Sequence, residues 1–188
     1  SFPTRRSSDL AAGGAEPLVN CPWNPAEHRV VGTVGRLQAV KNQALLVRAF
    51  ARARELSPVV RERARLSVVG DGPARAEVQS VLDACGAAPS VWLAGERADV
   101  PQVMRSLHAF VLPSMAEGVS NTILEAMATG LPVLATAVGG NGELVQPGVT
   151  GQLTPSNDVE AMAQALASWA ADPPQTAAWG ASARAVAE

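Results

Sequence analysis

The segment AFVLPSMAEGVSNTILEAMATGLPVLAT, residues 109–136, decides the fold class, because it predicts a strand, a helix and a second strand in succession. Residues 109–112 are a short apolar run of the kind that forms a buried strand. Residues 121–129 have a helical spacing of apolar side chains that ends at Gly130, and residues 132–136 are a second apolar run. Short buried strands that alternate with helices favour a parallel sheet that is covered on both faces.

The same alternation continues on both sides of this segment. Further strands are predicted at residues 30–34, 66–69, 91–94 and 151–153, and further helices at 42–56, 74–85, 100–107, 158–171 and 174–188. The pattern therefore predicts an α/β domain built on a doubly wound, Rossmann-like parallel sheet.

Composition limits the class of protein. The chain has 188 residues, 47% of them hydrophobic and 17% charged, with a formal net charge of −2. These values favour one soluble domain with extra sequence at its ends, and they disfavour binding to nucleic acid or to an anionic membrane through basic charge. We expect neither a membrane span nor a signal peptide, and hence a cytoplasmic location. Cys21 and Cys85 lack CxxC spacing, which suits a reducing compartment and argues against a structural metal site.

The first 28 residues differ in character from the rest of the chain. Residues 1–10 (SFPTRRSSDL) have no periodicity and resemble a reading frame through a sequencing adapter, so we expect them to be non-native. Residues 11–28 are rich in glycine and proline, which is typical of a linker or a truncated connection. The domain proper is expected to span residues 29–188.

Two loops carry charged residues where a ligand is expected, since ligands of open α/β sheets bind at the carboxyl ends of the strands. In GRLQAVKN (residues 35–42), Gly35 permits close approach of the backbone, and Arg36 and Lys41, the only lysine of the chain, place two cations near a strand end. Such a pair suits a diphosphate whose negative charge grows as a bond breaks. The alternative is that both side chains are solvated surface charges.

The second loop, which follows the predicted strand at 109–112, leads into the predicted helix at 121–129. It carries Glu117, and a second carboxylate, Glu125, follows eight residues later on the helix. Ser120 or Asn121 is a candidate N-cap, and the free amides of Ser120, Asn121 and Thr122 are expected to point at a phosphate. The two carboxylates are then suited to divide the ligand, with one bound to a ribose diol and the other to a sugar hydroxyl. The alternative is an exposed loop acid and a solvated helix residue.

These motifs resemble those of a known family. The Glu117 to Glu125 spacing within EGVSNTILEAMATGLPV, with GRLQAVKN upstream and VGGNGELVQPGVTGQL (residues 138–153) downstream, is similar to the donor-binding half of retaining glycosyltransferases of family four, which have the B fold. The resemblance covers residues 30–171. Within that family, the chain is most similar to bacterial sugar transferases of exopolysaccharide gene clusters.

The resemblance implies a role for each matching residue. Arg36 and Lys41 match the pair that binds the donor diphosphate, Glu125 the acid on the nucleotide ribose, and Glu117 the acid that faces the transferred sugar. The amides of Val119 to Thr122 contact sugar and phosphate, and the loop around Arg97 passes the base. Gly139 and Gly140 match a glycine pair whose role we limit to loop shape. Members of the family generally need no bound metal, in agreement with the absence of an Asp-x-Asp pair from this sequence.

The resemblance also implies a second domain. Family members bind the acceptor, a glycan or a lipid-linked molecule, with an N-terminal domain, and only a linker-like stretch precedes residue 30 here. The chain is therefore expected to be a fragment with half an active site. Peripheral association with the inner face of the membrane is implied for the full-length protein alone.

Two other functions compete with this one. A module that binds nucleotide without chemistry has the same motifs, and a transfer assay on the full-length protein separates the two. A redox Rossmann domain is disfavoured because the first strand-to-helix loop lacks GxGxxG. The sugar, the base and the acceptor are not specified by the sequence.

Overall fold

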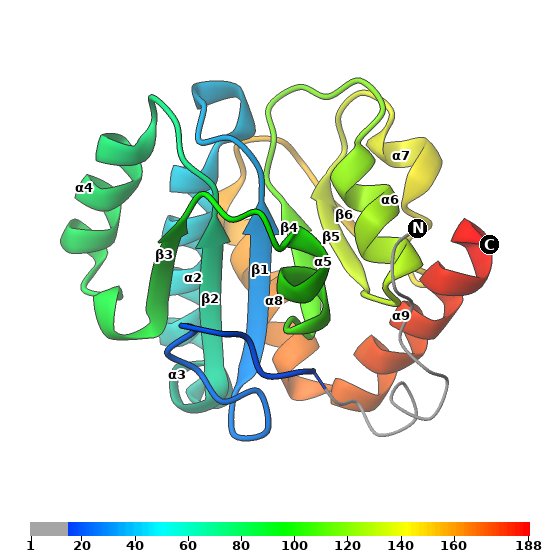
Figure 1. The fold of residues 1–188 in the computed structure, drawn as a ribbon, viewed down its shortest axis with the longest axis horizontal. Coiled ribbons are helices and arrows are strands. Elements are labelled where there is room, and N and C mark those ends of the chain that lie inside the picture. Colours follow the sequence, from blue (N-terminus) through cyan, green and yellow to red (C-terminus); the bar gives the residue numbers. More distant parts are fainter. Residues whose placement is uncertain (1–14) are drawn as a thin grey trace.

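Six parallel strands form the centre of the computed structural model, which describes residues 15–188 (Figure 1). The prediction for residues 1–10 lies outside the described residues. The strands follow the order β3-β2-β1-β4-β5-β6, so that the chain first builds the sheet outward from β1 to β3 and then returns to the other side of β1. Their bounds are Arg29–Val34 (β1), Ala64–Val69 (β2), Val91–Gly95 (β3), Ala109–Leu112 (β4), Val133–Thr136 (β5) and Gly151–Thr154 (β6). This is the doubly wound order, and the predicted fold class is confirmed.

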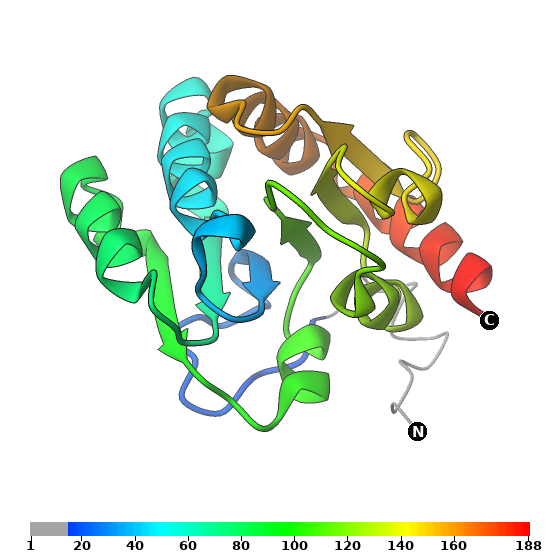
Figure 2. The same ribbon diagram turned by 90° about the horizontal axis from the view of Figure 1, so that it is seen from above.

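Helices cover both faces of the sheet, as Figure 2 shows from above. One face is packed by α2, α3, α4 and α8, and the other by α5 and α6, with α9 lying against α6. The helices span Gln43–Leu56 (α2), Pro58–Arg63 (α3), Arg75–Cys85 (α4), Val100–Arg105 (α5), Asn121–Ala128 (α6), Asn141–Leu144 (α7), Val159–Ala171 (α8) and Pro173–Ala187 (α9), with 3-10 turns at Ala39–Lys41 (η1) and Ala88–Ser90 (η2).

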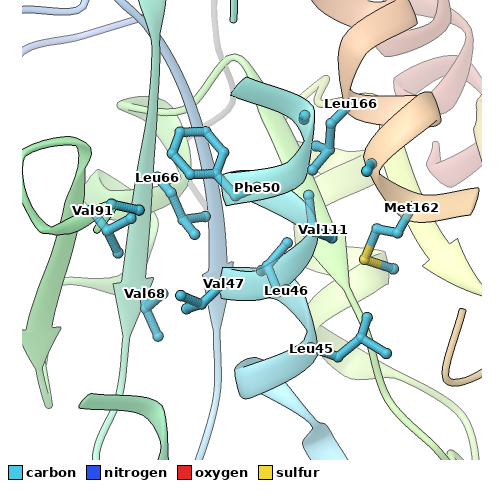
Figure 3. Packing of buried hydrophobic residues seen from close by; sticks show 14 of the residues in the cluster. Leu45, Leu46, Val47, Phe50, Leu66, Val68, Val91, Val111, Met162 and Leu166 are labelled. Carbon is cyan, nitrogen blue, oxygen red and sulfur yellow. The ribbon is translucent and has the colours of Figure 1, made fainter. Parts of the chain in front are cut away.

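The core consists of two apolar layers, one on each face of the sheet. Leu46 and Phe50 of α2 pack against the strands in the first layer (Figure 3). Alternate residues of one strand serve both layers: Val111 of β4 faces α2, whereas Phe110 lies among the residues of α5 and α6. Since successive strand side chains point to opposite faces, a strand buried on both sides has no polar position, which explains its unbroken apolar run.

The predicted elements agree with the structure within a few residues at each end, and the differences are local. The helix predicted at 100–107 ends at Arg105. The sequence pattern does not predict α3 (Pro58–Arg63), which follows α2 after a single residue and leads directly into β2. Its start is nevertheless well formed, since the Ser57 hydroxyl accepts a hydrogen bond from the Val60 amide and Pro58 occupies the first turn.

Residues 15–28, expected to form a linker, contain no helix or strand but pack against the domain. Leu18 is buried in the layer that contains α5 and α6. Glu16 forms an ion pair with Arg105, with the Nε and Oε2 atoms 2.9 Å apart. The guanidinium of Arg65 lies 5.5 Å from the centre of the Trp23 ring. This segment therefore covers part of the sheet face rather than extending away from it.

Candidate functional site

The two charged loops meet at the carboxyl end of the sheet, between β1 and β4. Strand order reverses at this point, and in open α/β sheets the reversal opens a crevice in which ligands bind. The loop after β1 and the loop after β4 are joined there by a main-chain hydrogen bond of 2.8 Å from the Met115 amide to the Val40 carbonyl. The upper edge of the sheet in Figure 1 is therefore the candidate site.

Lys41 and Glu117 are bound to each other in this crevice. Lys41 Nζ lies 2.6 Å from Glu117 Oε1, and the side chains are 30% and 7% exposed. The same oxygen accepts a hydrogen bond of 2.5 Å from the hydroxyl of Ser114, a residue that sequence analysis did not single out. The expected cation and the expected sugar-binding acid thus form one unit, and neither is a solvated surface charge.

The start of α6 presents unbonded amides beside this pair. Ser120 is the N-cap, and its hydroxyl accepts a hydrogen bond of 3.3 Å from the Ile123 amide. Within residues 15–188, the amides of Val119, Ser120, Asn121 and Thr122 donate no hydrogen bond to another group. Four such donors at the positive end of a helix dipole favour an anion.

Glu125 lies one turn into α6 and is half-buried. Its burial raises the pKa of the carboxyl above the ordinary value. The carboxylate has no hydrogen-bond partner among the described residues, so its oxygens remain available to hydroxyl groups of a ligand. Among the described residues, no hydrogen bond joins Glu125 to Glu117.

A groove of about 420 Å³ lies across the ends of β1, β2 and β3, and it shares the loop after β1 with the crevice. Gly35, Arg36 and Arg97 are among its lining residues. Arg36 is exposed and forms no ion pair within residues 15–188, so its guanidinium is free to meet an anion. Gly70 brings the loop after β2 close to the loop after β1, because a Cβ atom on Gly70 would lie 1.9 Å from the Gly35 carbonyl oxygen.

Arg97 differs from Arg36 in that its side chain is occupied. It donates two hydrogen bonds to Asp99, of 2.8 Å from Nε and 2.7 Å from an Nη atom, and it lies 5.7 Å from the centre of the Trp92 ring. The Arg97 guanidinium holds the pKa of the Asp99 carboxyl below its ordinary value. Arg97 therefore shapes the wall of the groove.

Gly139 and Gly140 pack directly against the loop that carries Glu117. A Cβ atom on Gly139 would lie 1.7 Å from the Glu117 carbonyl oxygen, and Gly139 has a φ of +49°. The Gly140 amide donates a hydrogen bond of 3.2 Å to the Gly118 carbonyl. The sequence predicts that this glycine pair shapes its own loop. The structure shows that the pair also packs against the neighbouring loop, at Glu117 and Gly118, a contact that the sequence spacing does not indicate.

A second cavity lies at the opposite end of the strands and does not belong to this site. It has a volume of about 80 Å³ and is lined mainly by apolar side chains such as Phe50, Leu166 and Trp169. Two of its polar side chains are bonded internally, since the Val30 amide donates a hydrogen bond of 3.0 Å to His108 Nδ1 and Trp169 Nε1 donates to Gln152. We interpret it as a packing gap between α3, α8 and α9.

The site is therefore suited to an anion flanked by hydroxyl groups. Arg36, Lys41 and the α6 amides supply positive charge, and two carboxylates supply hydrogen-bond acceptors. In residues 15–188, no three His, Cys, Asp or Glu side chains gather as a metal site would require. Within residues 15–188, each helix is too short or too polar to span a bilayer.

Residues 28–172 match the family model described as "Glycosyl transferases group 1". Among curated proteins, the chain is 37% identical over 153 residues to a D-inositol 3-phosphate glycosyltransferase of Kribbella flavida, covering 77% of the chain and 36% of that protein. It is 34% identical over 173 residues to the lipopolysaccharide core biosynthesis mannosyltransferase LpcC of Rhizobium leguminosarum, covering 88% of the chain and 47% of that protein. The chain thus spans less than half the length of these relatives.

Solved structures agree with this assignment. The Anabaena protein Alr3699/HepE, crystallised with UDP and glucose, superimposes with a TM-score of 0.81 and 28% identity, covering 98% of the chain and 48% of that protein. A C-terminal domain of the group 1 glycosyl transferase LpcC from Francisella tularensis has a TM-score of 0.73 at 20% identity, which shows the fold alone, and the match covers 84% of the chain and 83% of that domain.

Gly139→Ala is predicted to destabilise the protein and to displace the loop that carries Glu117. A methyl group at this position meets a main-chain oxygen and requires a left-handed backbone, a combination that costs about 1–3 kcal/mol. The free energy of unfolding, measured by chemical denaturation, checks the result. Gly142→Ala is the matched control, because no atom lies within 4 Å of the place its methyl group would take, and it is expected to be neutral or slightly stabilising. Equal stabilities of the two variants would contradict the assigned contact.

Proposed function

Because the chain belongs to the glycosyl transferases group 1 family, we propose that it is the donor-binding half of a retaining glycosyltransferase of family four with the B fold. It binds a nucleotide-diphosphate sugar and, with an acceptor-binding domain, transfers the sugar with retention of configuration to a glycan or lipid-linked acceptor. The observation that carries this proposal is the gathering of Arg36, Lys41 and the unbonded α6 amides at the point where strand order reverses.

The charges suit the departure of a nucleoside diphosphate. When the bond from the sugar to the diphosphate breaks, negative charge accumulates on the phosphate oxygens, and preorganised donors lower the energy of that state. Arg36 and Lys41 contribute charged donors, and the amides of residues 119–122 contribute neutral ones. In this proposal the cations and amides neutralise the diphosphate without a bound metal ion.

The two carboxylates, Glu125 and Glu117, bind different parts of the donor. Glu125, which is half-buried and has no partner among the described residues, binds the ribose diol. Glu117 faces the transferred sugar, and the groove beside Gly35 and Arg97 receives the base. The Anabaena relative was solved with UDP-glucose, so UDP-glucose is the first donor to test.

The relatives also suggest the setting of the reaction. A relative of 34% identity takes part in lipopolysaccharide core biosynthesis, which supports a role in making bacterial surface polysaccharide, and specifically exopolysaccharide. We propose that the full-length protein works in the cytoplasm at the inner face of the membrane, where a lipid-linked acceptor is located.

Arg36→Ala and Lys41→Ala are each predicted to weaken binding of UDP. Loss of one charge-assisted contact costs about 1.5–3 kcal/mol, or roughly tenfold to hundredfold in affinity. Lys41→Ala is expected to cost more, because it also leaves the Glu117 carboxylate unneutralised beside the phosphates. Calorimetry with UDP measures the affinities, and Arg48→Ala, which removes an exposed arginine on α2, is the control. Wild-type affinity in both site variants would refute the assignment.

Glu125→Gln and Glu117→Gln are predicted to affect different parts of the donor. Glu125→Gln weakens the binding of UDP and of UDP-glucose to the same extent, because both ligands carry the ribose. Glu117→Gln leaves UDP affinity equal or higher, since it removes a negative charge and releases Lys41, but it abolishes the extra affinity contributed by the glucose. Calorimetric titration of each variant with both ligands separates these effects. The same loss for both ligands in both variants is the result that counts against this division.

Sugar transfer is predicted for a protein that joins this chain to an acceptor-binding domain, and not for the 188-residue chain alone. Transfer requires the acceptor hydroxyl to be held close to the sugar carbon, and this positioning contributes many orders of magnitude to the rate. A product assay with a panel of donors and lipid-linked acceptors tests both forms. Donor binding without transfer by the longer protein would favour the rival function, a nucleotide-binding module.

A further inference from the structure

We propose that Ser114 is a positioning residue, which holds the Glu117 carboxylate in the orientation that meets the donor sugar. Ser114 directly follows β4 and Pro113, and it is fully buried. Its hydroxyl donates a hydrogen bond of 2.5 Å to Glu117 Oε1. The proposal rests on the function given above, in which Glu117 faces the transferred sugar, and it assigns a role to a side chain that does not itself contact the donor.

The two oxygens of Glu117 have different surroundings. Oε1 accepts hydrogen bonds from both Ser114 Oγ and Lys41 Nζ, whereas Oε2 accepts none from the described residues and is not closed off from solvent. A carboxylate oxygen that already accepts two short hydrogen bonds has little capacity for a third. The geometry therefore fixes which oxygen is open to a sugar hydroxyl: Oε2.

Ser114 is itself held in place from the neighbouring strand. The hydroxyl of Thr136, at the end of β5, donates a hydrogen bond of 2.6 Å to the Ser114 carbonyl. The Thr136 carbonyl in turn accepts a hydrogen bond of 3.0 Å from the side chain of Asn141. Thr136 and Asn141 are both fully buried. Buried and connected hydrogen bonds of this kind resist rotation, so the Ser114 hydroxyl is a rigid support.

Lys41 alone does not supply the same constraint. Its ammonium group sits on a flexible four-carbon stem and is 30% exposed, so it can follow the carboxylate as the carboxylate rotates. Without the Ser114 hydroxyl, Glu117 keeps its charge partner but loses its fixed orientation. The contribution of the sugar to donor affinity should then fall, while binding of the diphosphate should change little.

The ligand-free protein offers a first test, because Lys41 is the only lysine in the sequence. With ¹³C-lysine labelling, the Cε group of Lys41 gives the only labelled lysine signal in the NMR spectrum. We expect Ser114→Ala to shift and broaden this signal, because the ammonium group then follows a mobile carboxylate, but not to bring it to its position in Glu117→Gln, which removes the charge partner. Ser106→Ala is the matched control, since it removes another buried serine hydroxyl, bonded at 2.7 Å to the Val103 carbonyl in α5. An unchanged signal in Ser114→Ala would overturn the proposal. Ser114→Cys, which preserves size but donates weakly, serves if the alanine variant does not fold.

The second test uses UDP and UDP-glucose as probes in a double-mutant cycle. We expect Ser114→Ala to reduce the ratio of the UDP-glucose affinity to the UDP affinity by about tenfold. The affinity for UDP itself should stay within about twofold of the wild-type value. In a Glu117→Gln background, Ser114→Ala should have no further effect on that ratio. Additive effects of the two substitutions would refute the proposal, because Ser114 would then not act through Glu117. If the Lys41 signal moves but the wild type gains nothing from the glucose, the positioning of Glu117 stands and the function proposed for Glu117 fails.

Discussion

Lys41 Nζ and Glu117 Oε1 lie 2.6 Å apart across the point where the strand order of the sheet reverses. The two residues are 76 positions apart in the chain, and the contact joins the loop after β1 to the loop after β4. Lys41, the cation proposed to bind a diphosphate, has its charge partly neutralised by this carboxylate before any ligand arrives. The arrangement nevertheless keeps both groups ordered, because each restrains the other in a crevice where a lone buried carboxylate would be costly.

The surrounding backbone makes this contact possible. β1 and β4 end side by side, and the hydrogen bond from Met115 to Val40 fixes the spacing of their loops. Gly139 and Gly140 then close the loop from the other side, at distances that leave no room for a side chain. Loops built from main-chain contacts of this kind have little freedom to rearrange, so the site is preorganised in the absence of a ligand.

The sequence predicts much of this because several of its signals are local. The apolar runs of β4 and β5 predict buried strands, Ser120 is a candidate cap before a helical stripe, and Arg36 and Lys41 lie in a strand-to-helix loop. Contacts between distant segments are not encoded in this way. Nothing near Lys41 indicates that its ammonium group meets Glu117, 76 positions later, and nothing near Gly139 indicates which carbonyl it approaches. The first contact requires β1 and β4 to lie side by side, and the second requires β4 to pair with β5, with Phe110 opposite Val133.

NMR mapping of the backbone amides with UDP shows directly whether the carboxyl edge of this sheet binds a nucleoside diphosphate. We expect the largest shift changes on adding UDP to fall on Gly35, Arg36 and residues 119–122. We expect no response from the amides around Phe50 and Trp169, at the opposite end of the strands. Shift changes centred on that apolar cavity, or none at saturating UDP and at saturating GDP, would mean that this edge of the sheet is not a nucleotide site.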